Sequence, residues 1–120
     1  MESNKFELTG KVNWLDVKAT DKGSYITRAI ISKKIKDDVY HSFVITMFGD
    51  IAAKFGDDVK AKQDTVHVTG RLSMSSYQKD GKNYDKVDLI VNEYEKVIYS
   101  ESAKGYVVID TETDEVPWGN

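Results

Sequence analysis

Two neighbouring stretches decide the fold class: GDIAAKFG at residues 49–56 and TVHVTGRLSMSSYQKDGKNY at residues 65–84. In the first, apolar residues fall on one face of a helix, and a glycine stands at each end. The second alternates apolar and polar residues at a period of two, as a half-buried strand does, and its Asp80-Gly81 is a strong hairpin signal. We therefore predict a short helix over Asp50–Phe55 that leads into a two-stranded hairpin.

Three further strands precede the helix. They are rich in β-branched and aromatic residues, and turn residues at Asp21–Ser24 and Lys36–Asp38 separate them. Three strands, a short helix between strands 3 and 4, and a hairpin predict an all-β fold, a five-stranded Greek-key barrel of the oligonucleotide/oligosaccharide-binding (OB) kind. A different five-stranded barrel with a capping helix fits the same pattern. The predicted strands are Phe6–Trp14, Tyr25–Ser32, Val39–Phe48, Thr65–Ser76 and Asp85–Tyr99.

The composition excludes several classes of protein. With 120 residues the chain has the size of one domain, and 40% hydrophobic residues can supply its core. The absence of cysteine excludes disulfides, thiolate metal sites and cysteine nucleophiles. No apolar stretch approaches the roughly 20 residues of a membrane helix, and residues 1–10 lack the apolar segment of a signal peptide. We therefore expect a cytoplasmic protein with no membrane partner.

Charge is distributed unevenly along the chain. Residues 1–99 carry 16 Lys and Arg against 15 Asp and Glu, a net charge of +1, whereas residues 100–120 carry one Lys against five acidic residues, a net charge of −4. We predict an OB-fold domain at 1–99 and an acidic C-terminal tail at 100–120. Such a tail is either a solubilising segment or an interaction segment. Within it, Tyr106–Ile109 would also fit an additional strand.

Strand parity sorts the side chains of the strands at 39–48 and 65–77 by face. Tyr40, Phe48 and Tyr77 fall on outward faces, among small polar and basic residues. Exposed rings in such surroundings suit base stacking, since every base has a π-face. The alternative is structural, with Phe48 packed under the helix and Tyr77 covering a hairpin. The core side is predicted to hold Val66, Val68, Gly70, Leu72 and Met74 in one strand and Phe43, Ile45 and Met47 in the other.

One block of the chain matches a known family pattern. Phe48-Gly49-Asp50-Ile51-Ala52 ends the predicted third strand, and Val66-His67-Val68-Thr69-Gly70-Arg71-Leu72 runs on to Tyr77 and, past a glycine-containing loop, to Tyr84. The block resembles the OB-fold single-stranded DNA-binding proteins of bacteria and phages, which carry Phe-Gly-x-x-Ala followed by Val-x-Val-x-Gly-x-Leu. The match covers about residues 6–98, and the short form resembles that of a phage or mobile-element member.

Both ends of the chain extend the resemblance. Leu8-Thr9-Gly10-Lys11-Val12 is similar to the family's opening Leu-x-Gly-x-Leu. The acidic tip is similar to the family's tip ending in Pro-Phe, which recruits replication and repair partners. Gly119-Asn120 follow the tip here, and the family's long Gly/Gln/Pro-rich linker is absent. The residues of the tip are Asp114, Glu115, Val116, Pro117 and Trp118.

The resemblance implies a sequence-nonspecific single-stranded DNA-binding protein that coats and protects DNA during replication, recombination and repair. It also implies a homo-oligomer, a dimer or a tetramer, whose tail recruits proteins such as a recombinase or a polymerase. In a phage member the compartment is the cytoplasm of the bacterial host. The candidate stacking residues are Phe48, Tyr77, Tyr84, Tyr40 and Trp14, and the candidate phosphate-contacting residues are Lys11, Arg28, Lys33, Lys34, Arg71, Lys79, Lys82 and Lys86.

Some positions depart from the family pattern. Ser42 stands where members often have an aromatic residue, and Tyr40 is its substitute on parity. Lys33 to Lys36 occupy the turn region where the family often has Trp, and serines stand at two positions of the fourth strand where some members have Arg. Trp14 shares its parity with core residues, so a core or rim position is as well supported as a DNA contact.

Catalysis has little support in the sequence. His41 and His67 lie on separate strands without cysteine, which argues against a zinc site, and no nucleotide-binding or nucleophile motif occurs. We expect no enzyme, no metal and no cofactor. Two alternatives to DNA binding stay open: a protein-interaction OB module of a replication or recombination complex with weak DNA binding, and an RNA-binding OB domain.

Overall fold

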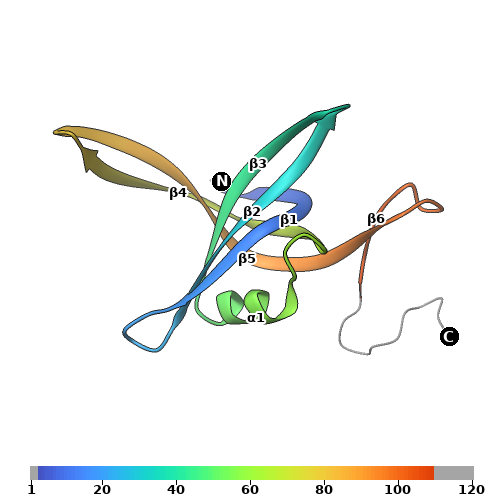
Figure 1. The fold of residues 1–120 in the computed structure, drawn as a ribbon, viewed down its shortest axis with the longest axis horizontal. Coiled ribbons are helices and arrows are strands. Elements are labelled where there is room, and N and C mark those ends of the chain that lie inside the picture. Colours follow the sequence, from blue (N-terminus) through green and yellow to red (C-terminus); the bar gives the residue numbers. More distant parts are fainter. Residues whose placement is uncertain (1–2, 110–120) are drawn as a thin grey trace.

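The computed structural model describes residues 3–109 of the chain. In this range, six strands and one helix follow one another (Figure 1). The turn of the predicted hairpin is formed by Asp80 and Gly81, both at positive φ (54° and 78°), as the favoured two-residue turns require. The elements are β1 (Phe6–Ala19), β2 (Tyr25–Lys36), β3 (Val39–Phe48), α1 (Asp50–Asp58), β4 (Thr65–Lys79), β5 (Lys82–Ser100) and β6 (Gly105–Val108).

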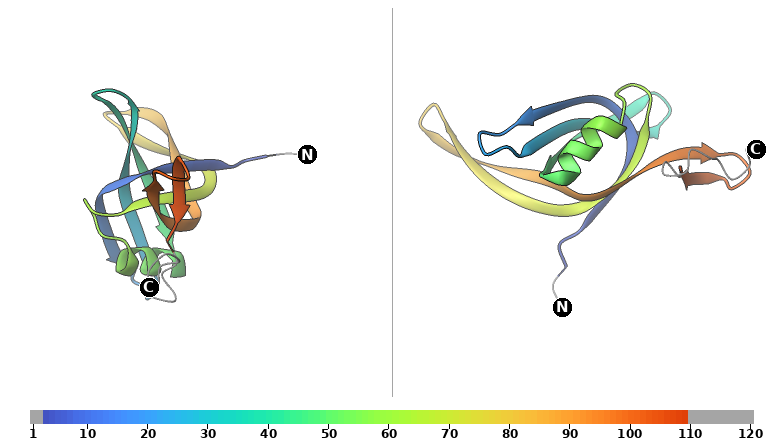
Figure 2. Two further views of the ribbon diagram at one scale, coloured as in Figure 1. Left: turned by 90° about the vertical axis from the view of Figure 1, so that its right-hand side faces the viewer. Right: turned by 90° about the horizontal axis from the view of Figure 1, so that it is seen from below.

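The first five strands close into a barrel. Neighbours in the order β3-β2-β1-β4-β5-β6 pair antiparallel, and β3 also pairs in parallel with β5, at Ile45 with Leu89 and Thr46 with Ile90. This closure, with α1 between β3 and β4, confirms the predicted five-stranded Greek-key barrel of the OB kind. From below, α1 lies in front of the strands, so it covers one end of the barrel (Figure 2).

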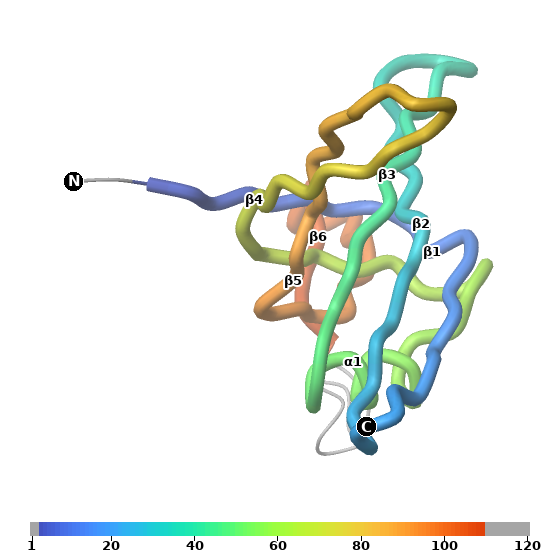
Figure 3. Tube along the Cα trace, turned by 90° about the vertical axis from the view of Figure 1, so that its left-hand side faces the viewer, coloured from blue at the N-terminus to red at the C-terminus, as the bar shows by residue number. Residues whose placement is uncertain are grey.

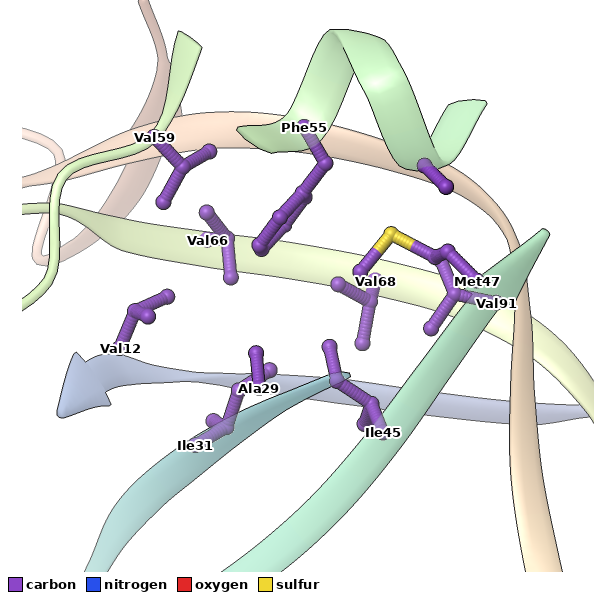
Figure 4. Close-up of a cluster of buried hydrophobic side chains, with 11 residues drawn as sticks. Val12, Ala29, Ile31, Ile45, Met47, Phe55, Val59, Val66, Val68 and Val91 are labelled. Carbon is purple, nitrogen blue, oxygen red and sulfur yellow. The ribbon is translucent and has the colours of Figure 1, made fainter. Parts of the chain in front are cut away.

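The core lies between the strands and α1. Phe55 is fully buried and points from the helix toward Val66 and Val68 (Figure 4). Burying a side chain of this size contributes roughly 1.5–3 kcal/mol. Thr27 is a fully buried polar residue, and its hydroxyl donates to the Ala52 carbonyl at 2.7 Å, which satisfies both groups.

The helix is longer than predicted. It continues through Gly56 to Asp58 instead of ending at Phe55. A Cβ at Gly56 would lie 2.4 Å from Val17 Cγ2, so this glycine allows close packing of the helix on β1 and does not end it. The helix ends where Val59 turns extended and its N–H donates to the Phe55 carbonyl at 3.0 Å.

Two residues predicted for the core are exposed. Val66 and Val68 are buried as expected, but Leu72 is 44% and Met74 is 64% exposed. Beyond a β-bulge opposite Thr69 and Gly70, β4 and β5 leave the barrel and pair with each other as far as their turn. The core prediction for Leu72 and Met74 is therefore wrong: they keep the inward parity, but no barrel interior lies beneath them.

A β-bulge in β1 decides the position of Trp14. The pairing with β2 shifts between Val12, which faces the buried Ile31, and Trp14, which faces Ile30. The extra residue turns Trp14 outward, and its side chain is half exposed. Of the two interpretations that the sequence left open, the core position does not apply.

Two hairpins project from the barrel end away from α1 (Figures 1 and 3). We call residues 71–90 the β4–β5 arm and residues 33–43 the β2–β3 arm. The arms diverge above the short parallel contact between β3 and β5.

β6 continues the sheet beyond the predicted barrel domain. It pairs antiparallel with β5 from Val97 opposite Val108 to Ser100 opposite Gly105. The additional strand considered for Tyr106–Ile109 is therefore present, at Gly105–Val108. We call residues 97–108 the β5–β6 hairpin; it points to the opposite side of the barrel from the β4–β5 arm (Figure 1).

Candidate nucleic-acid interface

The β4–β5 arm presents two stacked tyrosines. Tyr77 and Tyr84 lie directly opposite each other, with ring centroids 5.4 Å apart and ring planes at 21°. Tyr77 is 50% and Tyr84 41% exposed, so both keep ring surface free to receive another planar group. Four cations of the predicted set alternate with the tyrosines on the same face of the arm: Arg71, Lys79, Lys82 and Lys86.

A second group occupies the outer face of β1, β2 and β3. Arg28 lies between Asp16 and Thr46 in the sheet, and Phe48 follows two residues after Thr46 along β3, on the same face and opposite Ile26. Phe48 is half exposed, which argues against packing under the helix. Trp14 joins this face through its bulge, so the structure brings Trp14, Arg28 and Phe48 together on one surface.

The strand register connects these two groups. Arg71 lies opposite Ile90, Ile90 lies beside Thr46 across the barrel closure, and Thr46 lies opposite Arg28. Paired residues point to the same side of a sheet, so this row crosses four strands on the outward-pointing side of the barrel wall, where Ile90 is itself buried and the two arginines are exposed. With about 4.8 Å between strands, the two arginines are some 14 Å apart along the row.

A groove of about 390 Å³ separates the two arms above this row. Val44 and Thr46 line one wall from β3, and Lys86 and Leu89 line the other from β5. Lys86 also approaches Asp88 at 3.6 Å, an exposed ion pair of little energetic weight that leaves the ammonium available. Lys86 belongs to the face of the arm that carries the tyrosine pair, and Thr46 belongs to the arginine row, so the groove adjoins both groups.

The remaining predicted residues line a pocket separate from the groove between the arms. They are Lys11, Lys33, Lys34 and Tyr40, and the pocket has a volume of about 300 Å³. Tyr106 of β6 lines it too, a residue that the sequence analysis did not include among the site residues. The alternation around Tyr106 indicated a strand but gave no sign of which surface that strand would approach.

The outer face of β4 changes character along its length. Near the barrel, His67 is surrounded by Glu7, Glu93 and Glu95, and a hollow of about 220 Å³ lies among them. The His67 ring shares a hydrogen bond of 2.7 Å with the Thr9 hydroxyl. Beyond residue 70 the same face carries the cations of the arm. A polyanion is therefore repelled at one end of this face and attracted at the other.

Tyr94 and Lys96 belong to the support of the barrel. The Tyr94 hydroxyl donates to Asp58 Oδ2 at 3.0 Å, and its ring meets Phe55 edge to face at a centroid distance of 4.9 Å. Burial, and then the hydrogen bond and negative charge of Asp58, raise the pKa of Tyr94 well above its usual value. The Lys96 ammonium lies 3.3 Å from Asp58 and 3.9 Å from Asp64, so it is engaged within the protein.

Among residues 3–109, no group of three or more His, Asp or Glu side chains is placed to hold a metal ion. No helix in the described part of the chain is long and apolar enough to cross a membrane. The predicted partner-binding tip, Asp114–Trp118, lies outside the described residues, and its role stays a prediction.

No protein-family model and no curated protein matches this chain. The resemblance to single-stranded DNA-binding proteins therefore depends on the motifs in the sequence.

Proposed function

We propose that the protein binds single-stranded DNA without sequence preference and thereby coats and protects it during replication, recombination and repair. The observation that carries the proposal is the stacked pair of Tyr77 and Tyr84, exposed among four cations on a projecting arm. A ring with a free face accepts any unstacked base, at roughly 1–3 kcal/mol per base, and the cations accept the phosphates. Neither contact reads a base edge, so the binding has no reason to depend on sequence.

Single strands suit this surface better than duplexes. In a duplex the faces of the bases are already stacked on one another, so no base face is available to stack on the rings of Tyr77, Tyr84 and Phe48. The groove between the arms has a volume of about 390 Å³ and is lined by side chains from β3 and β5, a size that suits part of a single strand. Such a protein acts where DNA strands are separated for copying, so the proposed compartment is the cytoplasm, which for a phage member is that of the bacterial host.

A homo-oligomer and the recruitment of a recombinase or polymerase through the acidic tail complete the proposal. Both come from the family resemblance. An oligomer would join several of these small surfaces into one long path for the strand, and effective concentration would then raise the overall affinity without any new contact.

A protein-interaction module is the second candidate. The face of the β4–β5 arm opposite the tyrosine pair exposes Leu72, Met74 and Val87, three apolar side chains on one surface. Contiguous exposed apolar surface is a mark of sites where another protein binds. This observation favours an assembly role beside or in place of DNA binding.

One titration separates the candidates. Fluorescence anisotropy is followed with oligo-dT, oligo-U and duplex DNA at several salt concentrations, and Trp14 emission is followed in a Trp118→Phe variant. Tight binding to oligo-dT, weak binding to duplex and a salt slope of about −0.7 per phosphate contact support the proposal. Absence of oligo-dT binding at low salt overturns it in favour of the interaction module, and a clear preference for oligo-U favours RNA.

A further inference from the structure

The pocket beside the β2–β3 arm lies where β1 changes partners. Lys11 pairs with Ser32 of β2 on one side and with Thr65 of β4 on the other, and beyond this point β2 continues alone with β3. Tyr40, opposite Lys34, forms part of the wall on the arm. We call this the Tyr106 pocket, after the residue that lines it from the β5–β6 hairpin.

The β5–β6 hairpin positions Tyr106. Its ring meets that of Tyr99, directly opposite it, edge to face at a centroid distance of 5.6 Å. This contact restricts the ring of Tyr106, while 56% of the residue stays exposed. Tyr40, across the pocket, is 62% exposed. The pocket is therefore lined by two aromatic side chains, Tyr106 and Tyr40, that remain more than half exposed.

Three lysines give the pocket a positive charge. Lys11 and Lys33 form no ion pair with any of residues 3–109. Lys34 approaches Asp37 at 3.7 Å, but the Asp37 carboxylate is fully exposed, so this pair is weak and exchanges readily. Cations beside exposed rings match a nucleotide, which carries a phosphate and a planar base in one unit.

The volume limits the ligand to a small one. About 300 Å³ lies at the lower end of the range for small-molecule sites, roughly 300–1,000 Å³. The outer face of β3 also leads to this pocket: Phe48 and Tyr40 share that face and are eight residues apart, about 27 Å along an extended strand. A DNA strand that follows this face from Phe48 arrives at Tyr40 and at the pocket.

We infer that the Tyr106 pocket binds one nucleotide of a single strand that continues past the β2–β3 arm, with its phosphate on the lysines and its base against Tyr106. The inference rests on the proposed function. It makes β6, which lies beyond the part of the chain that resembles single-stranded DNA-binding proteins, a part of the DNA-binding surface.

The test compares three variants in the oligo-dT titration, with oligonucleotides of increasing length. Tyr106→Ala is expected to weaken binding to long oligonucleotides about 5- to 150-fold, the loss of one stacked base, and to leave binding to the shortest ones unchanged. Tyr106→Phe keeps the ring and is expected to bind like the original protein. Val108→Ala, on the same strand and equally exposed, is the matched control and is expected to have no effect.

Lys33→Gln provides a second measurement that does not depend on the hairpin. It is expected to reduce the magnitude of the salt slope by about 0.7, the contribution of one phosphate contact to a single strand. This variant decides the question if Tyr106→Ala disturbs β6, which far-ultraviolet circular dichroism would reveal.

Two failures are distinguishable. If the original protein binds oligo-dT and both Tyr106→Ala and Lys33→Gln bind it equally well at all lengths, the inference about the pocket is overturned and the proposed function stands. If the original protein does not bind oligo-dT, the proposed function and the inference are overturned together.

Discussion

Replacing Tyr77 by alanine removes one ring of the exposed pair on the β4–β5 arm. Tyr77 contacts Tyr84 at a centroid distance of 5.4 Å, and an aromatic pair of this kind contributes about 0.5–1.5 kcal/mol. The arm lies outside the barrel core, so the variant should fold with its melting temperature lowered by only a few degrees. The effect on DNA is larger: a stacked base is worth roughly 1–3 kcal/mol, so the dissociation constant for oligo-dT should rise about 5- to 150-fold.

The assay is anisotropy of a labelled oligo-dT at constant salt, since affinities at different salt concentrations are not comparable. Tyr25→Ala is the matched control. Tyr25 is 43% exposed, which is comparable with Tyr84. The next residue, Ile26, pairs with Phe48 and therefore lies on the outer face. The Tyr25 side chain alternates to the other face, so this control should bind DNA like the original protein.

The double variant Tyr77→Ala/Tyr84→Ala tests whether the two rings act as one unit. Each ring restricts the other, so removing the second should cost less than removing the first, and the two losses should not add. If Tyr77→Ala folds, keeps its melting temperature within a few degrees and binds oligo-dT as tightly as the original protein, stacking on this arm is not how the protein holds DNA.

Three further predictions concern the barrel and the tail. Gly70→Ala should destabilise the protein by about 3 kcal/mol or more in urea unfolding, because the new Cβ would lie 1.8 Å from the Ile90 carbonyl oxygen in the paired strand. Tyr94→Phe should flatten the loss of stability at alkaline pH. The raised pKa of Tyr94 favours the neutral phenol in the folded state, so its contribution is complete below about pH 10 and is lost as the pH rises further. Deleting residues 110–120 removes four carboxylates, changes the net charge from −3 to +1, and should preserve or increase affinity for oligo-dT while abolishing pull-down of replication or recombination partners.

Each of these has its control. Gly105→Ala should be nearly neutral, because the nearest atom to its Cβ is 4.0 Å away, and equal destabilisation of the two glycine variants would contradict the packing argument. Lysines also titrate at alkaline pH, so the measurement for Tyr94 is the difference in unfolding free energy between the original protein and Tyr94→Phe at each pH. If this difference does not change with pH, the phenol of Tyr94 is not the group responsible. Retained pull-down of a recombinase or polymerase by the truncated chain would refute the role of the tail.

The elements were predictable because their signals are local. The positive φ values at Asp80 and Gly81 are the conformations for which an Asp-Gly pair is selected, so the sequence located the turn to the residue. The periods of the strands and the short helix likewise depend on near neighbours. Gly56 shows the limit: it matched the signal for a helix end, yet its function is contact with Val17, a residue distant in the sequence.

Parity predicts which side of a strand a residue takes, but not what lies on that side. Leu72 and Met74 alternate correctly with Arg71 and Ser73, and they are exposed because β4 continues past the barrel wall. At Trp14 the parity itself was misleading, since an extra residue in β1 reversed it after Val12 and turned this side chain away from the core. Bulges depend on how two strands pair across the sheet, and no periodicity within one strand reports them.

One part of the candidate site could be predicted from neighbouring residues, and another part could not. Tyr77 and Tyr84 could be assigned together because they flank one tight turn. The Tyr106 pocket could not, because Tyr106 meets Lys11 and Tyr40 only through the path of three separate strands. Surfaces assembled from distant segments require the register of the whole sheet.

The same register is compatible with the proposed binding of DNA by a chain with a net charge of −3. Residues 1–99 are nearly neutral as a sum, but Glu7, Glu93 and Glu95 are gathered around His67 at one end of the outer face of β4, and the arm cations lie at the other. A strand of DNA interacts with the charges close to it and not with the net charge of the whole chain, since charges more than about 10 Å away are screened at 0.1 M salt. Attraction is then confined to the arms, and the few cations there cannot supply the affinity alone. The exposed rings beside them must therefore supply a large share of the binding energy, which is why substitutions of Tyr77 and Tyr106 test the proposal more sharply than substitution of any one lysine.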